Sequence, residues 1–559
     1  MSIIGTVYED VTTDVVGSIG TWQWLVVFLC TAFMVPSIFI QFEDMFLLRQ
    51  VENVMCIPPS DIQVTNTSLC FVHLEGNATA IIECERWYVK LLWMIWLQKA
   101  WMIFCDNRMK LVSTAMVSRV GQVFGSFIFG FISDSFGRKA AIMINVLSET
   151  ILGLLLTFCD SEAWYQLIVF LTSLCCSAFK YLGLILTCEI ASNEWRSWLN
   201  TIVMLPRLFA LICTVPLANC TGNQQTLSFI AVLYGAMLIV LLRWTPESPQ
   251  WLLYSRKIKK AERILLTAAV RNGIYLCSDF KIRPINQRAY SCIDEPRVCL
   301  GLLNTYNIRI TIFISLLFWA LYYFQWSYLY VRLYSDILEE QLLLKIFSFA
   351  LLFGGLVMLL ARKMILRHLL LISVLITGVF MTGDAFLSKE RTRNLLASIA
   401  LASSIVGHAI LLNITPRIFA IKIRSTLLGA CQAIGQVGSM IAYIIFLFDT
   451  MNSLTTMGVT IGITLTMSAL CLMLHDVDGR ELPDIMEDMD YFSELSKPLR
   501  WATQKTNSPS NEEVEMRIYS FNTVSSHSAE TIPPAQRIGF GRTWLFIRIF
   551  FNRFIRRPK

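Results

Sequence analysis

Residues 130–142, GFISDSFGRKAAI, place three charged side chains between two long apolar runs of the chain. The rest of the sequence is strongly apolar, since 55% of its 559 residues are hydrophobic, only 16% are charged and the mean hydropathy is +0.57. A soluble domain carries about a quarter charged residues. Apolar runs of roughly 20 residues cross a membrane as helices, because lipid cannot satisfy unpaired backbone groups. The sequence therefore predicts an all-α membrane protein in which 130–142 connects two spans.

Apolar stretches of sufficient length occur twelve times, and the N-terminus has no basic region typical of a cleaved signal. The segment 91–104 is also apolar but contains Gln98 and Lys99, so we interpret it as an interfacial or extracellular element, with a thirteenth span as the alternative. The twelve predicted spans are 22–42, 107–132, 139–158, 164–188, 198–220, 226–244, 309–331, 341–361, 365–386, 395–416, 423–447 and 452–474.

The composition of the connection 130–142 suggests more than a charged loop. Gly137 permits a tight turn, and Gly130 lets another helix approach closely. Asp134 can accept hydrogen bonds from a helix N-terminus or pair with a cation across the bundle. Arg138 and Lys139 would hold the turn on the cytoplasmic side. A plain positive-inside loop, the simpler interpretation, needs only the two bases.

Loop composition predicts the orientation of the chain in the membrane. Loop 245–308 carries ten Lys and Arg against five Asp and Glu, so it is expected in the cytoplasm. Loop 43–106 carries four Lys and Arg against eight Asp and Glu, together with glycosylation sequons at Asn66 and Asn77. An even set of cysteines in this loop indicates an oxidising exterior and at least one disulfide of undetermined pairing. The disulfide candidates are Cys56, Cys70, Cys84 and Cys105.

The spans divide into two groups of six around the long basic loop, which is the layout of a two-bundle secondary transporter. We expect a plasma-membrane protein with both termini in the cytoplasm and a monomeric transport unit. The predicted regions are an N-terminus at 1–21, an N-terminal bundle at 22–244 with the loop 43–106, a cytoplasmic loop at 245–308, a C-terminal bundle at 309–474 and a tail at 475–559.

The chain resembles the major facilitator superfamily, whose signature loop occupies the position of 130–142. More closely it resembles the organic cation, anion and carnitine transporters of solute carrier family 22, from about residue 8 to 490. Four stretches carry the resemblance in order. They are the glycines and Gln23 at 17–23, WMIFCD at 101–106, PESPQWLLYSRKIKKAERIL at 246–265 and GRELPDIMED at 479–488.

This resemblance implies a set of charged residues that close the cytoplasmic side in one state and separate in the other. Their alternative role is only to anchor helix ends. The second signature loop is eroded here to ARKMILRHLL at 361–370, and Arg417 replaces an acid of the family pattern, which puts the second half of the network in doubt. The implied gating charges are Asp134, Arg138, Lys139, Glu189, Arg196, Glu247 and Arg424.

Basic residues at membrane depth are expensive and usually face a cavity or a partner. Arg119, Lys180 and Arg207 lie within predicted spans, and we interpret them as a cationic wall for a substrate carboxylate or sulfate. The alternative is pairing inside the bundle, with Glu149 neutralising Arg119 or Lys180. Gln436 occupies a position where relatives often have a charged residue. The C-terminal bundle is therefore expected to be nearly charge-free at the cavity.

Aromatic residues at helical spacing line one face of span 309–331. Facing the cavity, they would stack on an organic substrate or hold a cation, and facing lipid they would form an interfacial belt. The resemblance favours Tyr323 and Gln325 as cavity groups, beside Tyr322 and Trp326. His408 is expected to be a packed, hydrogen-bonded histidine rather than a proton relay.

The tail at 502–535 reads as disordered, and RIGFGRTWLFIRIFFNRFIRRPK at 537–559 has seven bases and no acid. Its pattern suits an amphipathic helix on an anionic cytoplasmic leaflet, or a trafficking signal. No nucleotide-binding loop, catalytic constellation, cofactor or metal set is evident, and nothing suggests nucleic acid. The favoured function is secondary transport of organic anions or zwitterions. The alternatives are a cation or carnitine-like transporter and a transport-incompetent interaction protein.

Overall fold

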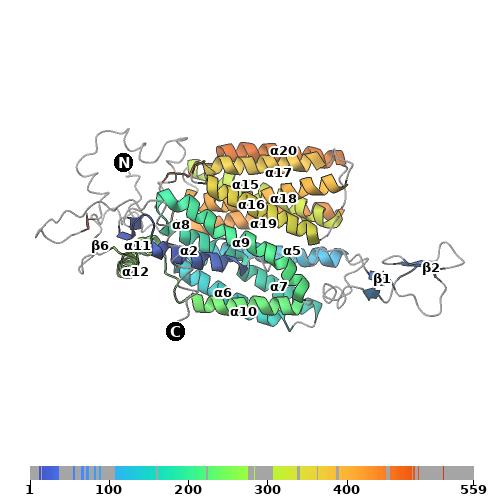
Figure 1. Ribbon diagram of the computed structural model, residues 1–559, viewed down its shortest axis with the longest axis horizontal. Coiled ribbons are helices and arrows are strands. Elements are labelled where there is room, and N and C mark those ends of the chain that lie inside the picture. Colours follow the sequence, from blue (N-terminus) through green and yellow to red (C-terminus); the bar gives the residue numbers. More distant parts are fainter. Residues whose placement is uncertain are drawn as a thin grey trace, which may run out of the picture.

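Each of the twelve expected spans contains helix in the computed structural model of the chain (Figure 1). The structure describes residues 12–13, 15–36, 54–56, 64–67, 71–74, 81–83, 87–89, 108–158, 161–221, 224–274, 282–283, 306–336, 340–361, 363–384, 390–448, 453–480, 482–484, 489 and 520–521. The N-terminal bundle contains α2 (Thr21–Met34), α5 (Arg108–Phe136), α6 (Arg138–Leu156), α7 (Glu162–Cys176), α8 (Leu182–Ile190), α9 (Asn193–Thr221) and α10 (Gln224–Leu241). The C-terminal bundle contains α15 (Tyr306–Asp336), α16 (Glu340–Leu360), α17 (Leu366–Asp384), α18 (Glu390–Ile418), α19 (Arg424–Phe448) and α20 (Ser453–Met473).

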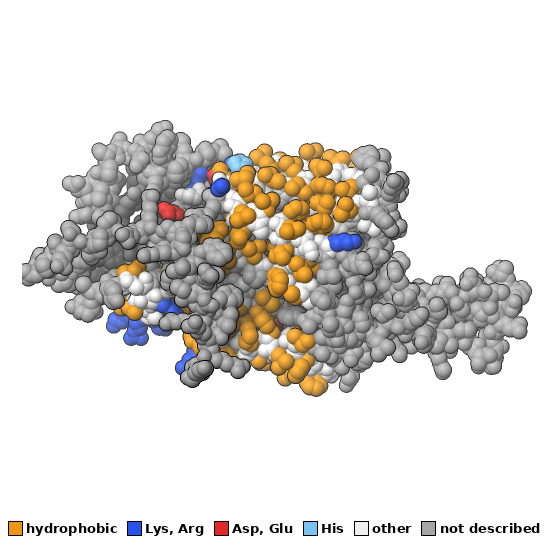
Figure 2. Space-filling view, viewed as in Figure 1, with side chains coloured by type: hydrophobic (Ala, Val, Ile, Leu, Met, Phe, Trp, Pro, Cys, Tyr) orange, Lys and Arg blue, Asp and Glu red, His pale blue; other side chains and the backbone are white. Residues whose placement is uncertain are grey.

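Most of these helices have the apolar composition of membrane spans. Among the described residues, seven helices are long and apolar enough to cross a membrane, and four shorter ones are apolar. Hydrophobic side chains cover the visible face of the bundle, and a group of Lys and Arg lies at the end of the molecule that holds α12 (Figure 2). Large exposed side chains such as Phe127 and Phe131 of α5 and Leu352 of α16 fit a surface solvated by lipid.

Two of the expected spans differ from the prediction in their detail. The helix α5 continues to Phe136, beyond the predicted end at 132, so Asp134 lies in a helix and Gly137 alone separates α5 from α6. Gly137 has φ +113, which a residue with a side chain rarely adopts. The span predicted at 164–188 is interrupted by a 3₁₀ turn, η2 (Ser177–Lys180), between α7 and α8.

Two short helices, α11 (Pro249–Tyr254) and α12 (Ile258–Arg271), follow α10 and lie at one end of the bundle (Figure 1). The strands β1 and β2 of loop 43–106 lie at the opposite end. The long basic loop and the acidic loop therefore emerge from opposite ends. Antiparallel pairing joins β1 to β5, β2 to β3, β3 to β4 and β6 to β7. Their bounds are β1 (Val54–Cys56), β2 (Val64–Thr67), β3 (Phe71–Leu74), β4 (Ile81–Glu83), β5 (Trp87–Val89), β6 (Ile282–Arg283) and β7 (Ser520–Phe521).

Asn272, at the end of α12, fastens that helix to the start of α2. Its Oδ1 accepts from the Trp22 N–H at 2.8 Å, and its Nδ2 donates to Gln23 Oε1 at 2.8 Å. A Cβ on Gly20 would lie 2.3 Å from the Asn272 side chain, so only glycine fits there. These contacts give a physical reason for the glycine and glutamine pattern at 17–23.

Several sequence predictions fall outside the described residues or side chains. Segment 91–104, residues 502–519 and the basic end at 537–559 lie outside them. The same holds for the side chains of the four candidate disulfide cysteines and of the sequon residues Asn66 and Asn77. The disulfide and glycosylation predictions therefore stay predictions.

Candidate functional site

The first element of the site is a contact between the two bundles at the end that holds α11 and α12. Asp134 near the end of α5 accepts from the backbone N–H of Ser425 at 3.2 Å and of Thr426 at 2.7 Å. It also accepts from the Thr426 hydroxyl at 2.8 Å. A carboxylate at a helix N-terminus satisfies orphan N–H groups and complements the helix dipole. Asp134 thus caps α19 of the other bundle.

A buried ion cluster lies next to this cap. Arg138 donates to both oxygens of Glu189, with its shortest contact at 2.7 Å, and lies 3.3 Å from Asp134. Arg424, from α19, donates to the same Glu189 at 2.9 Å. Arg138, Glu189 and Arg424 are each fully buried. One carboxylate thereby joins an arginine from each bundle, and charge-assisted contacts of this kind are among the strongest in proteins.

Glu247 completes the cluster from the loop after α10. Its Oε1 accepts from the backbone N–H of Arg138 at 2.7 Å and of Lys139 at 3.1 Å, so it caps α6. Burial raises the pKa of Glu247, and the N–H groups of Lys139 and Ser248 oppose that shift. Lys139 therefore contributes its backbone here. We call Asp134, Arg138, Glu189, Glu247 and Arg424 the inner gate, after the role that we propose for them below.

A second set of contacts, missed by the sequence analysis, accompanies the inner gate. Arg417 of α18 contacts Asp478 at 3.0 Å and donates to the Ser197 hydroxyl of α9 at 2.9 Å. Asp478 also accepts from Ser197 at 2.6 Å and caps α17 through the Leu366 N–H. The residue that broke the family pattern, Arg417, therefore joins the two bundles with a different acid. Asp478 follows α20 at a distance of 61 residues from Arg417, so spacing gave no signal of the pair.

Arg196 is buried and contacts backbone carbonyl groups. It donates to the carbonyl groups of Cys188 at 3.0 Å, Ala191 at 3.0 Å and Arg480 at 3.4 Å. These carbonyl contacts tie the turn after α8 to the segment after α20, and the grouping of Arg196 with Glu189 in one network of acid–base pairs stays a prediction.

A chain of polar side chains crosses between the bundles farther along α5. Lys180 Nζ donates to Gln122 Oε1 at 2.8 Å, and Gln436 Nε2 of α19 donates to the same oxygen at 2.9 Å. Arg119 then donates to Gln436 Oε1 at 3.2 Å and to the Tyr443 hydroxyl at 3.4 Å. We call these five residues the central network. It brings together Arg119, Lys180 and Gln436, which the sequence analysis had proposed separately.

Glu149 does not neutralise either base of the central network. Among the described residues no ion pair involves it, and its Oε2 is buried without a hydrogen-bond partner. The alternative that Glu149 pairs with Arg119 or Lys180 is therefore wrong in this structure, because both bases are held by amide oxygens. The backbone of Arg207 lies in α9, and its side chain is outside the described part.

Four rings of α15 surround His408 of α18, which excludes the lipid-belt interpretation for them. Ring centroids of Trp319, Tyr322, Tyr323 and Trp326 lie 5.7, 6.4, 5.3 and 6.1 Å from that of His408. Tyr323 Oη is 3.0 Å from His408 Nε2, so the histidine is packed and hydrogen-bonded as expected.

This aromatic cluster reaches the central network through α19. Tyr323 Oη donates to Gln432 Oε1 at 2.8 Å, and Gln432 lies one helical turn from Gln436. Two buried donors here, Gln432 Nε2 and Trp326 Nε1, have no hydrogen-bond partner. Unsatisfied buried donors are costly, so they are natural contacts for acceptor atoms of a ligand.

Two other predicted cavity residues point elsewhere. Gln325 Nε2 lies 3.4 Å from Thr464 Oγ1 and 3.7 Å from the Met381 sulfur, inside the C-terminal bundle. The Tyr322 hydroxyl donates to the Ser404 carbonyl of α18. Both contacts hold α15 within its own bundle.

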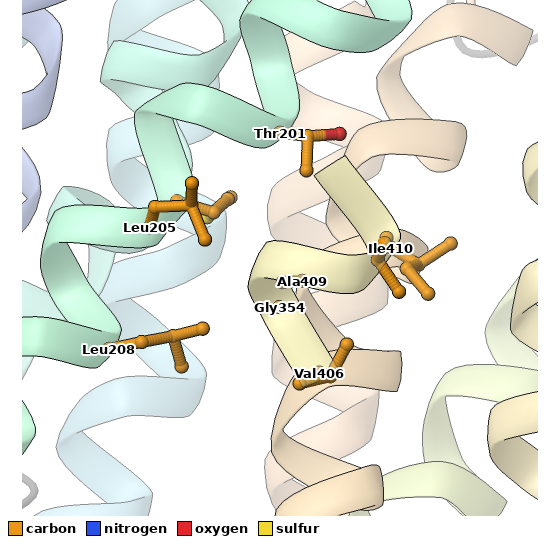
Figure 3. Close-up of a pocket in the computed structure, with 9 residues that line it drawn as sticks. Thr201, Leu205, Leu208, Gly354, Val406, Ala409 and Ile410 are labelled. Carbon is orange, nitrogen blue, oxygen red and sulfur yellow. The ribbon is translucent and has the colours of Figure 1, made fainter. Parts of the chain in front are cut away.

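A small apolar pocket opens between the bundles where α9 faces α16 and α18 (Figure 3). Leu205 and Leu208 point from α9 toward it, and Gly354 of α16 lies opposite. A Cβ on Gly354 would come within 2.6 Å of Leu208, so glycine permits this close approach. The remaining lining residues are Thr201, Met204, Val357, Val406, Ala409 and Ile410.

Comparison with known proteins agrees with this architecture. A profile of the family "Sugar (and other) transporter" matches residues 91–274. Organic cation/carnitine transporter 2 of Homo sapiens is 22% identical over 539 residues, which cover 86% of this chain and 94% of that protein. Solute carrier family 22 member 7 of Rattus norvegicus is 22% identical over 441 residues, covering 74% and 79%. By these matches the chain is similar to the solute carrier family 22 transporters of the major facilitator superfamily.

Solved structures support the fold of this solute carrier-like chain. The MFS (major facilitator superfamily) proton:xylose symporter XylE bound to 6-bromo-6-deoxy-D-glucose superposes with a TM-score of 0.55 at 15% identity, covering 84% of this chain and 98% of that one. The twelve-helix fold is thereby confirmed. The family consists of transporters and not enzymes. The likeness to these relatives supports a multi-pass membrane transporter.

Proposed function

We propose that the chain moves small organic anions or zwitterions across the plasma membrane by alternating access. The observation that carries the proposal is the central network. It places the side chains of Lys180 and Arg119 at a junction of the two bundles, where each binds a neutral amide. A substrate carboxylate or sulfate would be a stronger partner for both bases than an amide oxygen.

The chemistry of the neighbouring groups favours an organic anion over an inorganic one. Trp326 and Tyr323 supply ring faces beside Gln432, and the Gln432 amide and the Trp326 indole each offer a buried donor. Rings of this kind bury apolar surface, while the donors and bases orient a charged end. The bundles would separate at the inner gate once the substrate is bound, since those contacts form in one state and break in the other.

The alternative is a cation or carnitine-like substrate of the same fold. The aromatic cluster around His408 supports it, because ring faces attract a quaternary ammonium group. The relative named organic cation/carnitine transporter 2 supports it as well. A transport-incompetent interaction protein is the third candidate, motivated by the eroded loop at 361–370.

Uptake into cells that express the chain separates these candidates. We expect labelled benzoate to accumulate and tetraethylammonium to remain outside. Lys180→Ala should reduce anion uptake at least tenfold, because it removes the base from the Gln122 contact. Lys345→Ala, an exposed lysine of α16, is the matched control and should leave uptake unchanged. Tetraethylammonium uptake that is insensitive to Lys180→Ala would favour the second candidate, and no uptake of any probe at normal surface expression would favour the third.

The remaining features of the proposal concern location. We propose that both termini lie in the cytoplasm, that Asn66 and Asn77 are glycosylated, and that cysteines of loop 43–106 form a disulfide. We further propose that the basic end at 537–559 binds anionic lipid and that one chain is the transport unit. The charge asymmetry between loops 43–106 and 245–308 supports this orientation.

A further inference from the structure

A second buried polar site lies on α6, away from the central network. Asn145 is fully buried and Glu149 is 7% exposed, and they are four residues apart on one helix face. Asn145 Oδ1, Asn145 Nδ2 and Glu149 Oε2 are all buried without a hydrogen-bond partner. Three unsatisfied polar atoms on adjacent turns of one helix are exceptional, because nearly all such atoms are paired in folded proteins.

The position of this pair directs it away from lipid. The opposite face of α6 exposes Met143, Leu147 and Ile151, which suits contact with lipid. Asn145 and Glu149 therefore face the interior of the N-terminal bundle. Glu149 lies 11 residues after Arg138 (149 − 138), or about 16 Å along the helix, which places it well within the span.

The charged and titratable groups on neighbouring helices are already engaged. Tyr234 of α10 is within electrostatic range of Glu149, and its hydroxyl donates to the Ala32 carbonyl at 2.9 Å. Lys180 of η2 binds Gln122, and Glu189 of α8 binds Arg138. On α5, Arg119 binds Gln436 and Asp134 binds Thr426, and on α7, Cys175 lies toward Ser148. The other titratable side chains that the structure describes on α7 and α8 are Tyr165, Cys176 and Cys188.

A lone carboxylate at this depth requires a positive charge. An ionised carboxylate without a partner in a medium of low dielectric is strongly unfavourable, and intramembrane acids usually mark ion or proton pathways. A divalent metal is a poor match, since the described residues contain no group of three or more His, Cys, Asp or Glu that could hold one. One carboxylate beside one amide oxygen matches a single positive charge.

We propose that Glu149 and Asn145 form a binding site for a small monovalent cation, either a proton or Na⁺. A proton would reside on the Glu149 carboxyl, and Na⁺ would be ligated by the Glu149 carboxylate and the Asn145 amide oxygen. The site belongs to the N-terminal bundle alone and does not touch the central network. It is therefore independent of the charge of the transported substrate.

The test uses the full chain, purified and reconstituted in lipid nanodiscs. Infrared spectroscopy detects the carbonyl stretch of a protonated carboxylic acid, and equilibrium binding of ²²Na⁺ measures the metal. If the ligand is a proton, wild type shows a carboxylic acid band that is lost in Glu149→Gln. If it is Na⁺, wild type binds ²²Na⁺ and Glu149→Gln lowers the affinity at least tenfold. Glu194→Gln, at an exposed acid of α9, should alter neither measurement.

Identical spectra and identical ²²Na⁺ binding in wild type and Glu149→Gln would overturn the proposal. Asn145→Ala leaves the Glu149 carboxyl in place and is the second test variant if Glu149→Gln fails to fold. It should shift the carboxylic acid band or weaken ²²Na⁺ binding at least threefold. If Asn145→Ala changes neither the carboxylic acid band nor the affinity for ²²Na⁺, Asn145 is not part of the site. Uptake of benzoate is not measured here, so failure of the cation site and failure of the proposed substrate class remain distinguishable.

Discussion

Asp134 of the N-terminal bundle and Thr426 of the C-terminal bundle are joined by two hydrogen bonds, from the Thr426 N–H at 2.7 Å and from its hydroxyl at 2.8 Å. An acid of one bundle therefore caps a helix of the other. Under the proposed alternating-access function this contact would break when this end of the two bundles opens, which would link helix capping to conformational state.

Asp134→Asn should weaken the inner gate while preserving the size of the side chain. Loss of the charge at the α19 N-terminus and beside Arg138 is expected to cost about 1–2 kcal/mol. We expect a lower thermal unfolding temperature of the purified protein and slower uptake. Glu194→Gln, an exposed acid, is the control. An unchanged unfolding temperature together with unchanged uptake would show that Asp134 does not stabilise this state.

A disulfide between positions 133 and 425 should hold the inner end closed. The hydroxyl oxygens of Ser133 and Ser425 are 3.0 Å apart, and the backbone of Ser425 lies against Gly130. Oxidation of the Ser133→Cys, Ser425→Cys double variant is expected to abolish uptake, and a reductant should restore it. Each single variant is treated identically as a control for the native cysteines. Full uptake by a demonstrably cross-linked protein would contradict a moving contact here.

Gly130→Ala should separate the bundles without disturbing either one. A Cβ at Gly130 would lie 2.5 Å from the Ser425 carbonyl oxygen, which cannot move independently of α19. We expect at least tenfold slower uptake at near-normal expression. Gly355→Ala is the matched control, since nothing lies within 4 Å of a Cβ there. If both variants transport equally, the close approach of α5 and α19 does not matter for turnover.

Much of the fold followed from the sequence because span-length apolar runs have few structural solutions in lipid. The helix end at Phe136 was missed because hydropathy stops at Asp134, whereas the helix continues until Gly137 permits the turn. Similarly, the 3₁₀ break before Tyr181 leaves no mark in an apolar run.

The candidate site was predictable only where a residue is unusual for its surroundings. Bases at membrane depth drew attention to Lys180 and Arg119, but Gln122, Gln432 and Tyr443 are ordinary interior residues. Their importance comes from contacts between bundles, which require the tertiary arrangement. The spacing of residues along the chain cannot supply this information.

A double-mutant cycle can measure the coupling free energy between Arg417, which replaces an acid of the family pattern, and Asp478, its partner in this structure. The side chains of Arg417 and Asp478 are 1% and 17% exposed. Arg417→Gln leaves the acid without its cation and should cost about 3 kcal/mol, whereas adding Asp478→Asn should recover part of that loss. Unfolding free energies of the two single variants and the double variant give the coupling. Additive effects would mean that the two residues act independently.

His475, just after α20, should make stability depend on pH. Burial lowers its pKa to about 4, and the positive charges of Arg480 and Arg367 act in the same direction. The unfolded chain binds a proton near pH 6.5 while the folded state resists it until about pH 4, so stability falls as pH drops through this window. Between pH 7 and 5 the loss is about 2 kcal/mol at this residue. Thermal unfolding measured at pH 7 and at pH 5 checks this predicted loss of stability. His475→Gln, which can still bond to the Thr311 hydroxyl, should show a smaller decrease, and an equal decrease in the two proteins would assign the effect to other groups.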